Sequence, residues 1–475
     1  MTVGRFGALA RLPVLAPFGT RSFRFQWPAD LCVAWALEME TLILGWYVLV
    51  ETGSVMMLTL FAALQFIGTL ASPLLGTLGD RVGLRRVLAT MRFAYALLAG
   101  VILLLAASGH LHPVAVLCVA AVAGMIRPSD IGMRTALVGA TVPPQQLMAA
   151  MSISRTSMDS AKVAGALVGA GVVAAFGMVA AYCAITLIHL AGALLTLKVD
   201  AGRHALAIAP AVAPAIAPAV APGVAPAGAP AVAPAVAPAV APAAPRPSPW
   251  HELRAGLAYV WHTPQLLAAM AVAALVNFSA FPFTGGLMPY IAREVFQLDQ
   301  RGLGGLLACF AAGSLVGSLL MGTLGGRLRP GRAMLVACVL WYCCLAGFAA
   351  STQLAVAMPL LVAAGLAQST SMLSLQMLLL RSSDQRFRGR IMGVRMLAIY
   401  PLPLGLLIAG GLIPRIGFGW TAAALISCGL VLALAIGLAW RRHLWRLDAP
   451  GNALAAAPVV PVAPAALRRS GPPAC

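Results

Sequence analysis

Two carboxylates, Glu38 and Glu40, stand near the middle of a long apolar run at residues 28–50. An ionisable group inside a bilayer costs at least a few kcal/mol, so it generally faces a partner or a water-filled cavity. Burial favours the neutral form of a carboxyl group, and an acid that exchanges its proton near neutral pH can carry protons. Residues two apart point to different helix faces, so only one should face such a cavity. We expect Glu38 to be the proton-carrying acid and Glu40 to be the second candidate; a permanently paired structural charge is the alternative.

More charges fall inside two later apolar runs. Arg127 and Asp130 are three residues apart, a spacing at which helical side chains can form an ion pair. Arg155, Asp159 and Lys162 form a row at positions i, i+4 and i+7 of a helix. We expect these groups to line a charged cavity together with the glutamates. The alternative is that the first pair is structural and that Asp159 and Lys162 satisfy each other.

The second half of the chain offers softer groups within its apolar runs. Asn277 and Phe281 stand in one run, and Gln368 and Gln376 stand in another. Aromatic rings with a few amide groups suit an amphipathic organic ligand. We therefore expect these residues to line the same cavity. The alternative is packing or lipid contact, which is the commoner role of aromatic residues in such runs.

Composition shows which elements must position these residues. Charged residues make up 9% of the chain, hydrophobic residues make up 61%, and the mean hydropathy is +0.92. A soluble domain needs a more charged exterior than this. Apolar runs of about 20 residues, each able to cross a ~30 Å hydrocarbon core as a helix, recur about twelve times. We expect spans at 28–50, 55–78, 88–107, 113–137, 150–175, 178–198, 265–290, 302–325, 333–351, 354–379, 391–413 and 418–440. The sequence thus predicts an all-α membrane protein with twelve transmembrane helices.

The arginines predict how these spans are oriented. Those on one side are Arg81, Arg85, Arg86, Arg327, Arg329, Arg332, Arg381, Arg386, Arg388 and Arg390; the other side keeps Arg293, Arg301 and Arg415. Short loops rich in arginine stay in the cytoplasm, so both termini are expected on the cytoplasmic side. The membrane is expected to be the plasma membrane of a bacterium. The net charge of +19 is then explained by orientation and by anionic lipid heads, and a nucleic-acid partner is not expected.

A six-residue phrase occurs once in each half. The copies are Gly76-Thr-Leu-Gly-Asp80-Arg81 and Gly322-Thr-Leu-Gly-Gly326-Arg327. Both end a long apolar run, and further arginines follow each copy. The glycines permit a tight turn and close helix approach, while the acid can pair with an arginine or with a helix N-terminus. The repeat indicates a duplicated membrane domain, and hence two bundles of six helices.

The first copy, extended to Gly83, resembles the signature loop of the major facilitator superfamily. The resemblance covers nearly the whole chain outside a central linker and the tails. It implies two bundles that rock about a central site, and a cytoplasmic loop that latches the outward-open state. The implied gating residues are Gly76, Asp80, Arg81, Gly83, Arg85, Arg86, Gly322 and Arg327. Gly326 replaces the acid in the second copy, so the second latch is expected to be weak.

Four short motifs resemble the branch of enterobactin-exporter-like and macrolide-efflux-like carriers. They are Thr52-Gly53-Ser54, Val142-Pro143, Leu287-Met-Pro289 and Arg388-Gly389-Arg390. This resemblance implies a proton-coupled exporter of amphipathic small molecules, such as drugs or siderophore-like metabolites. Ala166 stands where the antiporter signature of the family places a proline. An uptake carrier for a metabolite and a non-transporting membrane sensor or scaffold are the alternatives.

The segment between the halves should not cross the membrane. It carries proline at every fourth position from Pro210 to Pro242, and each interior proline removes a helical hydrogen bond that lipid cannot replace. The expected parts are a cytoplasmic N-terminal segment at 1–27, a six-helix bundle at 28–199, a cytoplasmic Ala/Pro-rich linker with an interfacial helix at 200–263, a second bundle at 264–440 and a cytoplasmic tail at 441–475.

Cofactor chemistry is not expected. The nine cysteines form no Cys-x-x-Cys motif and no Cys/His cluster, which disfavours a metal site. The only lysines, Lys162 and Lys198, do not stand in a phosphate-binding loop, and no nucleophile and base are paired, so neither an ATPase nor another enzyme is expected. The expected partners are a small-molecule substrate, protons and the lipid bilayer, and the expected assembly is a monomer.

Overall fold

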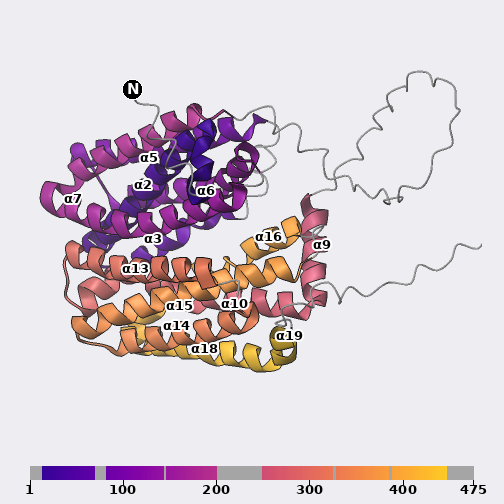
Figure 1. Ribbon diagram of the computed structural model, residues 1–475. Helices are drawn as coiled ribbons and strands as arrows, with labels where there is room; N and C mark the ends of the chain where they lie inside the picture. The colour runs from indigo at the N-terminus through magenta and orange to yellow at the C-terminus, as the bar shows by residue number, and fades with distance from the viewer. Residues whose placement is uncertain are drawn as a thin grey trace, which may run out of the picture.

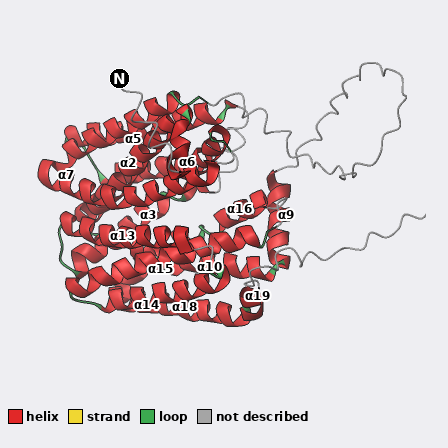
Figure 2. Cartoon of the chain, viewed as in Figure 1, coloured by secondary structure: helices red, strands yellow, loops and turns green. Residues whose placement is uncertain are grey.

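The computed structural model describes residues 13–69, 82–143, 146–200, 249–324, 328–383 and 388–446 (Figure 1). Within these ranges the regular elements are helices and no strand occurs (Figure 2). Nine of the described helices are long and apolar enough to cross a membrane, and one bent helix pair would add a tenth. The all-α membrane fold predicted from the sequence is therefore confirmed.

The N-terminal half is built around two consecutive helical segments that are joined at a kink and share one label, α7 (Leu147–Leu197). Its other helices are α2 (Arg21–Thr52), α3 (Val55–Leu64), α5 (Leu84–Ala107) and α6 (Pro113–Thr141). Both α2 and α5 pack extensively along α7. Two short 3₁₀ turns, η1 (Pro13–Gly19) and η2 (Ile67–Thr69), complete this half. The rest of the run expected at 55–78 lies outside the described residues.

The element α7 contains two of the expected spans. At Gly177 the backbone adopts φ 80° and ψ 179°, which breaks the helix between the runs expected at 150–175 and 178–198. Only glycine adopts such a positive φ without a steric penalty. The first helix also begins earlier than expected, at Arg21 rather than at residue 28, because Phe23 is fully buried in a cluster with Trp27 and Val138.

The C-terminal half lies beneath the first in Figure 1. Its longer helices are α10 (Pro264–Ser279), α13 (Gln300–Leu324), α14 (Pro330–Ala350), α15 (Leu354–Arg381), α16 (Arg388–Leu397), α17 (Pro401–Ile416) and α18 (Phe418–Ala439). The central helix α15 packs against both α13 and α14. After α10 the chain continues in three short pieces, α11 (Phe281–Thr284), α12 (Met288–Tyr290) and a π-turn, η4 (Ile291–Val295). The span expected at 265–290 is therefore interrupted, with Pro282 and Pro289 each in the first turn of a piece.

Two short helices lie at one end of the C-terminal half. The helix α9 (Pro249–His262) packs against α16, and its residues Arg254–His262 meet α10 at 109°. Figure 1 shows α9 running across the ends of α16 and α10. The second short helix, α19 (Arg441–Arg446), contacts α14 and α18.

The two halves make their closest contacts at the end that carries the turn at Gly53. A Cβ atom placed on Gly304 of α13 would lie 2.7 Å from the Cβ of Ala170 on α7. In the same way, a Cβ atom on Gly410 of α17 would lie 3.0 Å from the Cβ of Thr59 on α3. The guanidinium of Arg293 also donates a hydrogen bond across the halves, to the carbonyl of Leu49 (3.0 Å). This end of the molecule is therefore closed.

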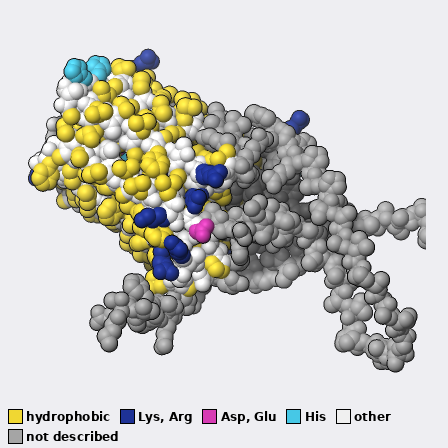
Figure 3. All heavy atoms as spheres, turned by 90° about the horizontal axis from the view of Figure 1, so that it is seen from above, with side chains coloured by type: hydrophobic (Ala, Val, Ile, Leu, Met, Phe, Trp, Pro, Cys, Tyr) yellow, Lys and Arg dark blue, Asp and Glu magenta, His cyan; other side chains and the backbone are white. Residues whose placement is uncertain are grey.

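The outer surface suits contact with lipid tails. Figure 3 shows hydrophobic side chains over most of the described surface in that view, with lysines and arginines gathered toward one side. Large apolar side chains stand exposed on the spans, and Leu97, Leu104 and Phe176 are each 70% exposed or more. Such a broad apolar exterior is stable only when lipid or another apolar surface covers it.

Candidate functional site

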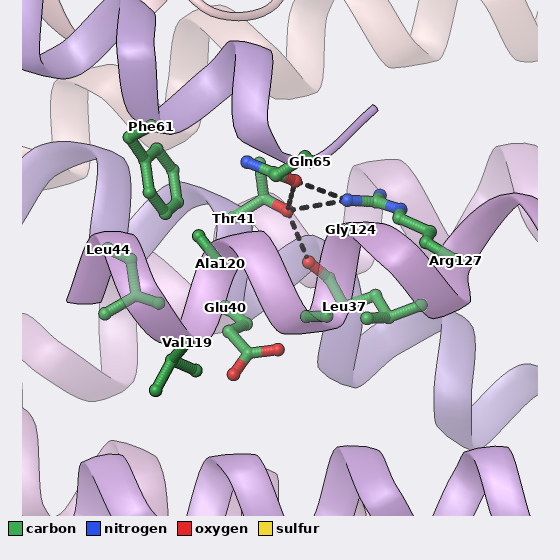
Figure 4. Close-up of a pocket in the computed structure, with 11 residues that line it drawn as sticks. Leu37, Glu40, Thr41, Leu44, Phe61, Gln65, Val119, Ala120, Gly124 and Arg127 are labelled. Carbon is green, nitrogen blue, oxygen red and sulfur yellow. Dashed lines mark hydrogen bonds between the residues drawn. The ribbon is translucent and has the colours of Figure 1, made fainter. Parts of the chain in front are cut away.

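A small cavity lies inside the N-terminal half, among α2, α3 and α6. Its volume is about 30 Å³, room for one or two water molecules. Four polar side chains line it, Glu40 and Thr41 from α2, Gln65 after the end of α3, and Arg127 from α6 (Figure 4). The remaining wall is made of apolar residues such as Phe61. The cavity is thus a charged pocket with apolar walls and with room for water.

Arg127 is anchored on one side of this cavity. Its guanidinium donates hydrogen bonds to the amide oxygen of Gln65 and to Thr41 Oγ1 (3.4 Å). The hydroxyl of Thr41 donates in turn to the carbonyl of Leu37 (2.8 Å). The ion pair that the spacing of Arg127 and Asp130 allows does not form, because the two side chains reach different neighbours. Asp130 lies instead 3.7 Å from Nε of Arg92 on α5.

Glu40 faces the other way, toward a histidine. In Figure 4 its carboxylate points away from Thr41 and Gln65. Its Oε2 lies 3.8 Å from Nε2 of His189 on α7; the glutamate side chain is 12% exposed and the imidazole is fully buried. The imidazole also lies against the ring of Tyr95 on α5, with 5.6 Å between ring centroids. The sequence analysis missed His189, although a histidine inside an apolar run is the signal that could have found it.

Glu38 occupies a different face of α2, against α7. A Cβ atom placed on Gly165 would lie 2.8 Å from the Cβ of Glu38, and one on Gly169 would lie 3.1 Å from the Cα of Met39. These glycines let α7 approach the backbone of α2 closely. Glu38 is half-buried and is not among the residues that line the small cavity.

A buried charge cluster lies at the other end of α2. Arg92 is fully buried and donates hydrogen bonds to Asp30 of α2 and to the hydroxyl of Thr196 on α7 (2.6 Å). Asp130 completes the cluster, so two carboxylates share one guanidinium. Asp30 and Arg92 were not singled out from the sequence, although the rule that selected Glu38, an ionisable residue inside an apolar run, applies to both. The cluster joins four helices of the N-terminal half.

The row on α7 forms an ion-pair chain. The buried carboxylate of Asp159 lies 3.2 Å from Nε of Arg155 and 3.5 Å from Nζ of Lys162. The alternative interpretation named only the contact with Lys162. The two cations keep 46% and 40% of their side-chain surface exposed. Arg155 also acts electrostatically on Arg395 of α16, in the other half.

Asn277, Phe281 and Gln368 contact other residues of the C-terminal half. The amide of Asn277 donates to the carbonyl of Ala273 on the same helix (2.8 Å), and Gln368 accepts a hydrogen bond from Ser314 (3.4 Å). Phe281 packs edge-on against the buried Trp341, with 5.1 Å between centroids. Gln376 is half-buried on α15. These residues do not join the cavity that Glu40 lines.

Four of the proposed gating residues lie within the described ranges: Gly83, Arg85, Arg86 and Gly322. Gly83, with φ 102°, precedes the first turn of α5, and Arg85 donates to the carbonyl of Val199 (3.1 Å). Arg86 and Gly322 are exposed. Four of the gating residues lie outside the described residues: Gly76, Asp80, Arg81 and Arg327. Across the described residues, no three metal-binding side chains gather in one place.

Comparisons with known proteins point to one family. The family model of the Major Facilitator Superfamily matches residues 31–403, and a second match covers residues 285–472. No curated protein matches the chain by sequence.

Several solved transporters share the fold. A bacterial homolog of the human lysosomal transporter Spinster, in an inward-facing and unoccupied conformation, is 13% identical, with 90% of this chain and 99% of that chain covered and a TM-score of 0.61. The nucleoside transporter NupG is 14% identical, with coverage of 88% and 99% and a TM-score of 0.60. The peptide transporter POT in complex with sulfate is 13% identical, with coverage of 90% and 96% and a TM-score of 0.64.

Proposed function

The chain belongs to the major facilitator superfamily, and from that premise we propose that it is a proton-coupled secondary transporter that exports amphipathic small molecules. It is a multi-pass membrane transporter rather than an enzyme. In the proposed cycle, protons moving down their gradient drive the substrate the other way, and the two halves rock about a central site. The export direction rests on the four motifs that resemble enterobactin-exporter-like and macrolide-efflux-like carriers.

The observation that carries the proton coupling is the position of Glu40. Glu40 lines a water-sized cavity, and the charged partner of its carboxylate, among the described residues, is a histidine rather than a lysine or arginine. A permanent ion pair with arginine would hold a carboxylate in its charged form, whereas a histidine can itself be neutral near pH 7. In the proposed cycle, Glu40 is the group that takes up and releases the transported proton. We assign this role to Glu40 rather than to Glu38, because Glu38 packs against Gly165 of α7.

The proposed orientation places both termini in the cytoplasm of a bacterium and the turn at Gly53 outside. The closed end of the molecule would then face outward, and the conformation would be open toward the cytoplasm. In that state a substrate would enter from the cytoplasm, and the arginine-rich loops would lie on the same side. The same proposal divides the chain into parts that begin at residues 28, 200, 264 and 441. It also includes a linker held at the membrane surface by α9 and a monomeric assembly.

The test uses inside-out vesicles that contain the full chain and a pH-sensitive dye inside. A proton gradient is imposed, and a panel of cationic drugs, macrolides and siderophores is added outside. Export by antiport predicts that one class causes proton release from the vesicle lumen, absent from vesicles without the protein. Proton uptake together with the compound would instead indicate import by symport. No proton movement with any compound, from folded and inserted protein, would overturn proton-coupled export for these substrates.

A further inference from the structure

A buried histidine lies beside the acid proposed to carry the proton. His189 is 0% exposed, and within the described part of the chain neither of its ring nitrogens has a hydrogen-bond partner. Buried ring nitrogens are usually paired, so an unpaired imidazole needs an explanation. The nearest charged group is Glu40, whose Oε2 lies 3.8 Å from Nε2. We propose that His189 and Glu40 share one transported proton, so that the imidazole is a second proton-binding group of the coupling site.

The surroundings allow a proton to move between these two groups. Transfer breaks the O–H bond of the Glu40 carboxyl and forms an N–H bond at Nε2 of His189, leaving a carboxylate beside an imidazolium. The neutral pair and the ion pair have the same net charge, so transfer moves no net charge into the apolar interior. Release of the shared proton leaves one negative charge, which the nearby Arg127 can balance across the cavity.

The distance indicates how the transfer takes place. At 3.8 Å the oxygen and nitrogen are too far apart for a direct hydrogen bond. Glu40 lines a cavity with room for one or two water molecules, so a water molecule or a rotation of the glutamate side chain can close the gap. The site would then receive its proton from the cavity and hold it on the histidine.

Other charged and titratable groups surround the pair of His189 and Glu40. Tyr95 of α5 packs against the imidazole, and Tyr182 of α7 lies near Glu40. Arg127 and Asp130 of α6 and Arg92 of α5 also act electrostatically on Tyr95. Neither tyrosine hydroxyl has a hydrogen-bond partner among the described residues. Asp130 and Arg92 pair with each other, and Glu40 is the charged group that lies against His189.

The decisive measurement is a pH titration of the histidine rings by NMR. The full chain, labelled with ¹⁵N-histidine, is placed in lipid nanodiscs of phosphatidylethanolamine and phosphatidylglycerol. The chain has seven histidines, and the signal missing in His189→Gln identifies the buried one. We expect that signal to titrate between about pH 5 and pH 9, and its midpoint to move to lower pH by about one unit or more in Glu40→Gln. His110→Gln, in an exposed turn, is the matched control and should leave it unchanged.

Two results would overturn the proposal that His189 and Glu40 share a proton. One is a His189 signal that stays in one protonation state across this pH range in both proteins. The other is a titration midpoint that is the same in Glu40→Gln as in the unsubstituted chain. If His189→Gln does not fold, the comparison of the unsubstituted chain with Glu40→Gln still decides, because only a histidine near Glu40 shifts strongly.

This inference rests on the proposed proton coupling, and transport assays separate the two. If the unsubstituted chain shows no proton-driven transport, the proposed function fails whatever the NMR signal does. If proton-driven transport persists at the same rate in Glu40→Gln, the function stands, but Glu40 does not carry the proton and the sharing of the proton fails with it. If Glu40→Gln abolishes proton-driven transport while His189→Gln keeps the rate and its pH dependence, only the sharing of the proton fails. The inference predicts that folded His189→Gln keeps substrate exchange but changes the pH dependence of proton-driven transport, which a merely structural histidine would not do.

Discussion

Arg92 on α5 donates a hydrogen bond to the carboxylate of Asp30 on α2, and both side chains are buried inside the N-terminal half. Asp130 of α6 and Thr196 of α7 contact the same guanidinium, so one side chain joins four helices. Removing one partner of a buried ion pair leaves an uncompensated charge in a medium of low dielectric constant. The cluster is therefore a structural lock of this half.

Arg92→Met should destabilise the protein severely. Two buried carboxylates would lose their common cation, and breaking such a pair costs about 3–5 kcal/mol. Arg86→Met, on the exposed face of the same helix, is the control and should change stability by less than about 0.5 kcal/mol. Thermal unfolding of the detergent-purified variants measures both effects. Equal unfolding temperatures for the two variants would show that the buried cluster does not stabilise the fold.

Asp159→Asn should cost less than Arg92→Met. Its two partners, Arg155 and Lys162, keep nearly half of their side-chain surface exposed, so they can turn toward solvent when the carboxylate loses its charge. We expect a loss of about 1–2 kcal/mol. The same unfolding measurement tests the order of the two variants. A greater loss of stability for Asp159→Asn than for Arg92→Met would mean that the ion pairs of Asp159, rather than the cluster around Arg92, hold this half together.

Gly313→Ala should disrupt the packing of α13 against α15. A Cβ atom placed on Gly313 would overlap the carbonyl oxygen of Val362, and backbone atoms cannot move aside without shifting a helix. Overpacking of this kind costs about 1–3 kcal/mol. Gly322→Ala on the same helix meets nothing within 4 Å and should leave stability unchanged or slightly higher. If both alanines are tolerated equally in thermal unfolding, the two helices do not pack as closely as described.

Gly410→Val should shift the balance between conformations. The added side chain would collide with Thr59 where the two halves meet, so it disfavours the state in which this end is closed. Gly411→Val, whose nearest neighbour is the end of Met56 at 3.9 Å, is the control. Spin labels at residues 51 and 419, in a background without other cysteines, report the separation of the halves by pulsed electron resonance. We expect longer distances in Gly410→Val only; unchanged distances would contradict the account of closure.

The sequence predicted the helices well because length and polarity alone decide what can cross a bilayer. The two spans expected at 150–175 and 178–198 are both present within α7, on either side of the helix break at Gly177. The pieces α11, α12 and η4 were not foreseen, although Pro282 and Pro289 in a single apolar run indicate such breaks.

The candidate site was harder to predict because it depends on which helices are neighbours. Nothing along the chain indicates that α7 brings His189 to Glu40, about 150 residues away. Spacing within one helix favoured an Arg127–Asp130 pair, yet tertiary contacts gave each residue a different partner. Spacing did succeed for Asp159, whose partners lie within one turn of the same helix.

The most direct test of the central claim compares Glu40→Gln with the unsubstituted chain in reconstituted proteoliposomes, using the compound that releases protons in the vesicle assay. Two rates are measured, transport driven by an imposed proton gradient and exchange of labelled for unlabelled compound without a gradient. Proton coupling at Glu40 predicts that Glu40→Gln loses gradient-driven transport at least tenfold and keeps exchange, while Glu38→Gln retains both. Gradient-driven transport at the unsubstituted rate in Glu40→Gln would contradict the account.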